Sequence, residues 1–92
     1  MITLELFVSH RCISTLSAIA LAEKGVRQVP GVNLIIRSDI EPRARSLGLF
    51  TYPAFVLDGE ILAVGEPKLE HFIQFLRQKV EQKNIVGMKE DL

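Results

Sequence analysis

The chain has 92 residues, of which 48% are hydrophobic, which is enough for one domain with a single core and too few for two domains. Eleven basic and eleven acidic residues give a formal net charge of zero, and this balance argues against nucleic acid as a partner. The apolar runs are far shorter than the roughly 20 residues that a membrane span requires, so no membrane association is expected.

The only cysteine is Cys12, so the chain cannot form an internal disulfide. A lone thiol suits a reducing compartment, and the sequence enters a strand pattern at once, without a basic region or cleavage site. We therefore expect a cytoplasmic monomer, in which oxidation can link two copies through Cys12. The competing interpretation is that Cys12 is a small buried apolar residue.

The first half of the chain predicts a strand, a helix and a second strand. Apolar residues alternate over Ile2–Val8, as in a strand. From Cys12 they recur at helical spacing, and Gly25 is expected to end this helix. After a Pro30-Gly31 turn, the nearly continuous apolar run Val32–Ile36 predicts a strand buried on both faces.

A short helix follows the second strand. Ser38 or Asp39 is expected to cap it, Pro42 lies in its first turn and Gly48 ends it. Its arginines, Arg43 among them, are expected on its solvated face.

The second half predicts a hairpin and a long helix. Strands over Pro53–Leu57 and Glu60–Val64 are joined by the strong turn signal Asp58-Gly59. After Gly65-Glu66-Pro67, one apolar stripe indicates an amphipathic helix. The stripe consists of Leu69, Phe72, Ile73, Leu76 and Val80. From residue 84 the pattern fades, so residues 84–92 are expected to be a frayed tail.

The order β-α-β-α-β-β-α predicts an α/β fold over residues 1–83. Each of the first two crossovers contains a helix, which implies parallel strands and right-handed connections, whereas the last two strands form an antiparallel hairpin. The expected architecture is a mixed four-stranded sheet flanked by three helices.

Two segments resemble the thioredoxin superfamily, especially its glutaredoxin-sized members, and the resemblance extends over about Ile2–Val80. One segment is Leu6–Thr15, a strand and short loop followed by a cysteine that opens a helix. The other is Thr51–Gly59, similar to the family's cis-proline, strand and tight turn. The resemblance implies a thioredoxin-like fold and a cis peptide bond before Pro53. It also implies that Tyr52 offers backbone groups to an extended substrate.

The motif around the cysteine departs from the family. The usual Cys-x-x-Cys is here Cys12-Ile13-Ser14-Thr15, so threonine replaces the resolving cysteine. The Cys-Gly-Phe-Ser motif of monothiol glutaredoxins is also missing, and Val64-Gly65-Glu66-Pro67 stands where they have Gly-Gly-x-Asp. The resemblance therefore implies the fold more firmly than the activity.

Cys12 and Thr15 are the predicted catalytic residues. A helix N-terminus stabilises a thiolate, so the pKa of Cys12 is expected below the free value of about 8.5. His10 and Arg11 are expected to modulate it, and the Thr15 hydroxyl is placed to donate to the sulfur. Read as Ser9-x-x-Cys, however, the same string puts Cys12 in the resolving position, buried and inert.

The predicted substrate-binding residues are Thr51, Tyr52 and Pro53. Phe50 and Tyr52 either line an apolar patch for a peptide or pack in the core. No cofactor is expected. No metal is expected either, because one cysteine and two distant histidines show no ligand spacing.

The functional hypothesis is monothiol thiol–disulfide exchange through Cys12. Its partners would be protein thiols or disulfides, or a small-molecule thiol that releases the mixed disulfide. One alternative is a non-catalytic binding or adaptor module that keeps the groove beside Pro53. Another is a dedicated sulfur or electron carrier for one partner enzyme.

Overall fold

The structure is a computed structural model that describes residues 2–9 and 15–90. The order of elements is the expected β-α-β-α-β-β-α. The elements are β1 (Ile2–Val8), α1 (Thr15–Gln28), β2 (Val32–Ser38), α2 (Pro42–Ser46), β3 (Ala54–Leu57), β4 (Glu60–Val64) and α3 (Leu69–Glu90).

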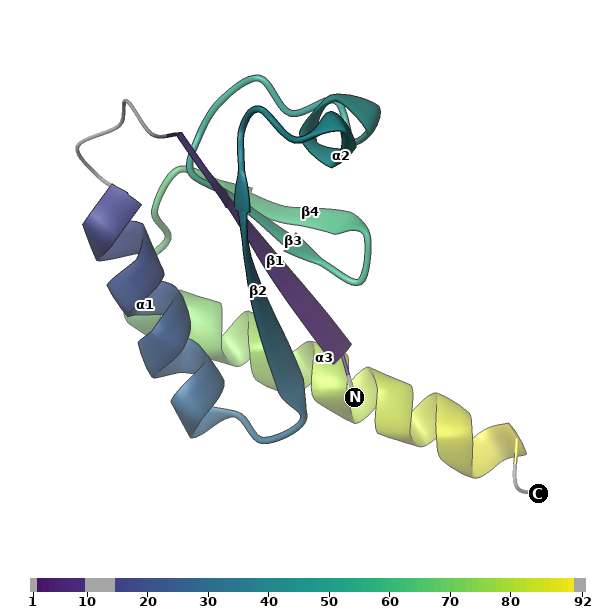
Figure 1. The fold of residues 1–92 in the computed structure, drawn as a ribbon. Coiled ribbons are helices and arrows are strands. Elements are labelled where there is room, and N and C mark those ends of the chain that lie inside the picture. Colours follow the sequence, from purple (N-terminus) through teal and green to yellow (C-terminus); the bar gives the residue numbers. More distant parts are fainter. Residues whose placement is uncertain (1, 10–14, 91–92) are drawn as a thin grey trace.

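The four strands form one mixed sheet in the order β2-β1-β3-β4. β1 pairs with β2 in parallel and with β3 antiparallel, and β3 and β4 form the antiparallel hairpin. The second crossover, through α2, therefore joins antiparallel strands and not the parallel strands expected from the sequence, because β3 pairs antiparallel with the central β1. α1 and α3 lie against one face of the sheet and α2 lies at the other (Figure 1). The mixed four-stranded sheet with three helices confirms the predicted fold class.

The main core lies between the sheet and the pair α1 and α3. Phe55 of β3 and Phe72 of α3 meet at its centre, with ring centroids 5.3 Å apart. The apolar stripe predicted for the last helix is confirmed, because Phe72, Ile73 and Leu76 are buried and its other members pack against the same cluster. Burial of these large side chains supplies most of the apolar driving force for the fold.

Gly25 does not end α1, as the sequence suggested. The helix continues through it to Gln28. A Cβ at position 25 would lie 2.3 Å from Cε2 of Phe72, so glycine is needed there to let α1 and α3 approach closely. The reversal comes later at Gly31, whose φ of 92° favours glycine.

β2 is not buried on both faces. It lies at the edge of the sheet, and only Val32 among its residues is buried, whereas Ile36 is 43% exposed. The apolar run Val32–Ile36 predicted the strand correctly but not its position. Strand order depends on which strand pairs with β1, and that is decided by contacts far apart in the sequence.

α2 covers the opposite face with a smaller apolar cluster. Its buried members are Phe7, Ala44, Leu49, Ala54 and Val56. The cap differs from the expectation, because the residue before the helix is Glu41 and makes no side-chain capping bond. The Ser38 hydroxyl instead accepts a hydrogen bond from the Ile40 N–H at 3.3 Å.

α3 extends to Glu90, seven residues past the boundary that the fading pattern suggested. The predicted apolar stripe ends at Val80, but the backbone hydrogen bonds of the helix do not depend on that stripe. None of the helices in the described part of the chain is long and apolar enough to cross a membrane.

Candidate functional site

Two segments with predicted site residues, one after β1 and one before β3, meet the segment after β4 at one edge of the sheet. Phe7, near the end of β1, pairs with Ala54 at the start of β3, and Ala54 pairs with Val64 at the end of β4. The segments just beyond these residues are therefore neighbours. The Gly65 N–H donates to the Pro53 carbonyl at 2.7 Å, which joins the β4 exit to the β3 entry.

The predicted residues Cys12, His10 and Arg11 lie outside the described residues. The two ends of their segment are described, and a hydrogen bond joins them: the Thr15 hydroxyl donates to the Ser9 carbonyl at 2.7 Å. The segment that contains Cys12 therefore starts and finishes at this sheet edge.

The bond from Thr15 differs from the role expected for this residue. The sequence suggested that its hydroxyl donates to the Cys12 sulfur, but a hydroxyl has one proton and this one points to Ser9. Thr15 thus closes the loop between β1 and α1. While this bond is in place, the Thr15 oxygen can only accept a hydrogen bond from a thiol.

The predicted substrate-binding residues form the entry to β3. The Tyr52–Pro53 peptide bond is cis, which is the isomer expected there, and Pro53 is buried. Tyr52 is half-buried against the α2 cluster and its hydroxyl donates to the Leu49 carbonyl at 3.2 Å. Thr51 is exposed.

The two aromatic residues beside Thr51 were expected either to line an apolar patch or to pack in the core, and the structure places them in different environments. Tyr52 belongs to the core, whereas Phe50 is 92% exposed. Leu16 in the first turn of α1 and Ile40 after β2 are also strongly exposed. Because β1 and β2 are parallel, the segments after both strands emerge at the same edge of the sheet as the β3 entry. This end of the molecule thus presents the strongly exposed apolar side chains of Phe50, Leu16 and Ile40 to solvent.

Ser17 and Glu66 belong to this edge and were missed at the sequence level. The Ser17 hydroxyl, in the first turn of α1, donates to a Glu66 carboxylate oxygen in the segment between β4 and α3. A carboxylate beside the positive end of a helix stabilises the helix, but it also opposes a second negative charge there. The departure Val64-Gly65-Glu66-Pro67 was the available signal.

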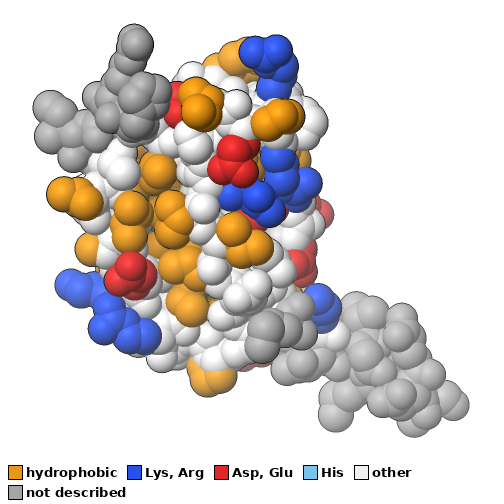
Figure 2. Space-filling view, viewed as in Figure 1, with side chains coloured by type: hydrophobic (Ala, Val, Ile, Leu, Met, Phe, Trp, Pro, Cys, Tyr) orange, Lys and Arg blue, Asp and Glu red, His pale blue; other side chains and the backbone are white. Residues whose placement is uncertain are grey.

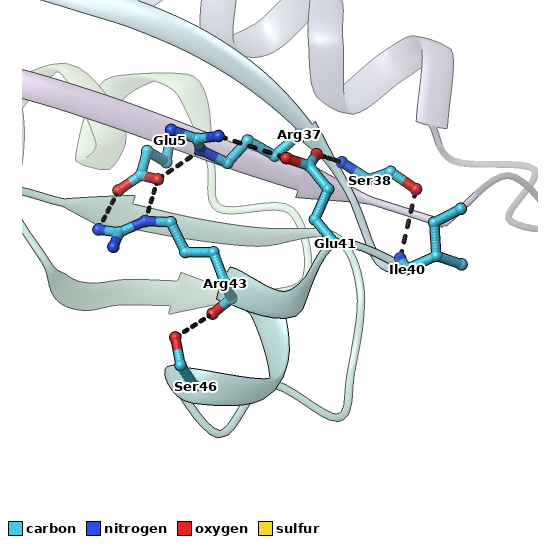
Figure 3. Close-up of polar contacts among 7 residues, drawn as sticks. All are labelled: Glu5, Arg37, Ser38, Ile40, Glu41, Arg43 and Ser46. Atoms are coloured by element: carbon cyan, nitrogen blue, oxygen red, sulfur yellow. Dashed lines mark hydrogen bonds and ion pairs between the residues drawn. The ribbon is translucent and has the colours of Figure 1, made fainter.

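A second polar cluster lies on the α2 face of the sheet (Figure 3). The buried Glu5 carboxylate accepts hydrogen bonds from Arg43, whose Nη2 lies 2.7 Å from Oε1, and from Arg37, whose Nε lies 2.6 Å from Oε2. Arg37 Nη1 donates to Glu41 Oε1 at 3.3 Å, and Glu41 Oε2 accepts the Ser38 N–H at 2.5 Å. These contacts connect β1, β2 and α2.

The two arginines favour the charged form of Glu5. The Arg43 hydrogen bonds are the largest influence and lower the pKa of Glu5, burial opposes them, and Arg37 adds to the lowering. The same contact raises the pKa of Arg43. Arg43 is therefore not merely on a solvated face, as the sequence suggested. No buried side-chain nitrogen or oxygen among the described residues lacks a hydrogen-bond partner, and the contacts of Glu5 with the two arginines hold α2 on the sheet.

No group of three metal-ligating side chains occurs among residues 2–9 and 15–90. A depression of about 380 Å³ opens beside the polar cluster, lined by Thr3, Glu5, Ile35, Arg37, Arg43, Asp58 and Gly59. Glu5 is paired there with Arg37 and Arg43, whereas Asp58 accepts the Thr3 N–H and pairs with Lys83.

Comparison with known proteins extends the structural result. No protein-family profile matches the sequence, and no curated protein matches it either. Among solved structures, the chain is similar to the zinc-bound form of human ERp44, with a TM-score of 0.63 and 16% sequence identity. The match covers 84% of this chain but only 26% of that protein. Together with the strand order and the helix placement, this similarity shows that the chain has a thioredoxin-like fold.

Proposed function

We propose that this protein exchanges disulfides with other proteins through the single thiol of Cys12. The observation that supports the proposal most directly is the arrangement at the sheet edge. Ser9 and Thr15, which flank the Cys12 segment, are hydrogen-bonded to each other, and the cis Tyr52–Pro53 bond begins the neighbouring strand. Because Cys12 lies in the short segment between Ser9 and Thr15, this arrangement supports a thiol close to the segment that the resemblance assigns to substrate binding.

The reaction is a two-step exchange. The Cys12 thiolate attacks one sulfur of a substrate disulfide, forms a new S–S bond and releases the other sulfur as a thiolate. An external thiolate then attacks the substrate sulfur of this mixed disulfide, which frees Cys12 and forms a disulfide between the external thiol and the substrate. No net oxidation occurs, because one disulfide is consumed and one is formed. A small-molecule thiol is the expected co-reactant, since the chain has no second cysteine.

The exposed apolar side chains favour a protein as the substrate. Three exposed apolar side chains lie near this edge: Leu16 after β1, Ile40 after β2 and Phe50 before β3. A small disulfide has little use for three separated apolar contacts, whereas a partner polypeptide can cover all of them.

The first test is the pH dependence of Cys12 alkylation by iodoacetamide in the folded protein. We expect the thiol to react at neutral pH with a pKa below the free value of about 8.5, because the start of α1 favours the thiolate. Cys12→Ser should take up no label. A thiol that reacts only after denaturation would show that Cys12 is buried and would end the exchange hypothesis.

Glu66→Gln sharpens this measurement. Removing the carboxylate that contacts Ser17 in the first turn of α1 should lower the pKa of Cys12 by about a few tenths of a unit, since the opposing charge is exposed and partly screened. Glu70→Gln, another exposed carboxylate further along at the start of α3, is the matched control. Equal effects of the two substitutions would mean that Glu66 has no specific influence on the thiol.

A binding module without catalysis is the second candidate, and the exposure of Phe50 favours it as well. Phe50→Ser should weaken trapping of a peptide disulfide by Cys12 while leaving reaction with a small disulfide unchanged. Phe75→Ser alters the exposed phenylalanine of α3 and serves as the control. If wild-type protein binds the reduced peptide through Phe50 but reacts with neither disulfide, the binding module is the correct assignment.

A further inference from the structure

β2 is an outermost strand of the sheet, and the backbone N–H and C=O groups on its outer side have no partner strand in the part of the chain that the structure describes. The Ile2 N–H donates to the Gly31 carbonyl, and the Asp39 N–H donates to the Val8 carbonyl. In the parallel register, the backbone N–H and C=O groups of the odd-numbered residues of β2 therefore point toward β1. Backbone groups alternate along a strand, and those of Val32, Leu34 and Ile36 therefore point away from the sheet. None of the described residues supplies a hydrogen bond to them.

Side chains beside this edge are apolar as well. Figure 2 shows hydrophobic side chains gathered between α1 and β2, with charged side chains around them. Leu34 of β2 and Ile19, Leu21 and Val26 of α1 are only partly buried against the core, and Ile36 is 43% exposed. This strand has the composition of an interior strand but lies at the edge of the sheet.

The two edges of the sheet are protected differently. β4 has an irregular register opposite Phe55 and Val56 and begins with the charged Glu60, both of which discourage pairing with another strand. β2 has an unbroken register of seven residues along β1, and neither proline nor lysine lies within it. Its one charged residue, Arg37, is engaged by Glu5 and Glu41 on the α2 face.

We propose that two copies of this chain pair through β2, antiparallel about a two-fold axis at Leu34, to form one continuous sheet. In this register Leu34 faces Leu34 of the second copy, and Val32 faces Ile36. Each such pair can exchange both of its N–H···O bonds. The proposal is independent of the thiol chemistry at Cys12.

A second copy fits this edge better than an arbitrary peptide because the strand is complementary to itself. All side chains paired on the α1 face are apolar, and on the other face Asn33 meets Ile35 while Arg37 meets Gly31, so no like charges oppose one another. The pairing also terminates at both ends. Beyond it, Pro30 has no N–H to donate, and the Ser38 N–H is already taken by Glu41.

Sedimentation velocity over a range of concentrations, with reductant and in the Cys12→Ser background, tests the proposal without any disulfide-linked species. We expect a reversible dimer. Ile36→Lys should weaken it by about tenfold or more, because each interface then loses two apolar contacts. Ile61→Lys on β4, where the isoleucine is 48% exposed, should leave the dimer unchanged.

Amide hydrogen exchange provides a residue-specific readout. In the dimer the Leu34 amide should exchange at least about tenfold more slowly than in the Ile36→Lys variant. The amides of Ile35 and Arg37 face β1 and should stay protected in both, which verifies that the variant is folded. A monomer at all concentrations, or a dimer that Ile61→Lys disrupts as strongly as Ile36→Lys, would overturn the assignment.

Discussion

The two faces of the sheet are stabilised by different kinds of interaction. On the α1 and α3 face, large apolar side chains such as Phe55 and Phe72 pack without a charged group among the buried residues of the cluster. On the α2 face the apolar cluster is small, and the buried Glu5 with its two arginines fixes the short helix to the sheet. The α1 and α3 face is therefore stabilised by close apolar packing, whereas the α2 face also depends on ion pairs.

This difference has a consequence for function. Apolar packing responds little to pH, whereas a buried carboxylate and its partners lose their attraction when the carboxylate is protonated. α2 and the segments on either side of it, which lead to Ile40 and Phe50, are therefore the part of the molecule that acid should loosen first. The α1 and α3 face should remain packed under the same conditions.

The largest effect is expected from Phe72→Ala. It removes a fully buried ring between α1, α3 and the sheet, and should lower the free energy of unfolding by about 3–5 kcal/mol. Phe75→Ala, on the same helix but 44% exposed, should cost less than about 1 kcal/mol. Urea denaturation of both variants measures this, and similar losses would show that α3 packs differently.

Gly25→Ala tests the close approach of the two helices. The added methyl group would meet the Phe72 ring, so we expect a loss of about 2 kcal/mol despite the better helix propensity of alanine. The double variant with Phe72→Leu should lose less than the two single changes together, because the smaller side chain makes room. Strict additivity in the double-mutant cycle would contradict a direct clash.

Glu5→Gln tests the charged face. It leaves Arg37 and Arg43 without their carboxylate, and should lower the free energy of unfolding by about 1–2 kcal/mol because both arginines still reach solvent. Glu60→Gln removes an exposed ion pair with Lys79 and should have almost no effect. If the two substitutions cost the same, the Glu5 cluster contributes no more than a surface ion pair.

The smallest effect is the pH dependence that Glu5 imposes. Its pKa is lowered in the folded state by Arg43 first and by Arg37, so the stability it adds is present above its ordinary pKa of 4.5 and is lost as the pH falls through the folded value. The difference in stability between wild type and Glu5→Gln should therefore be constant from about pH 7 to 5 and shrink toward about pH 3. A difference that does not change with pH would rule out this linkage.

Local patterns were sufficient for most of the elements. The alternation over Ile2–Val8, the Asp58-Gly59 turn and the apolar stripe of α3 each depend on residues close in sequence, and all three appear in the structure. For the candidate site, the cis bond before Pro53 was predicted correctly, whereas Cys12 lies outside the described residues and its role stays a prediction. Ser17 and Glu66 were missed, because their contact joins residues 49 positions apart.

What the sequence alone determined was the order of the elements, the fold class and the position of Pro53 before the third strand, since periodicity and turn residues are local properties. Tertiary structure alone decided that β2 lies at an edge, that Gly25 is a contact rather than a helix end, and that Glu5 is buried with Arg37 and Arg43. The physical reason is common to all three. Strand pairing, helix approach and charge burial are energies of contact between distant segments, and they exist only once the chain has folded.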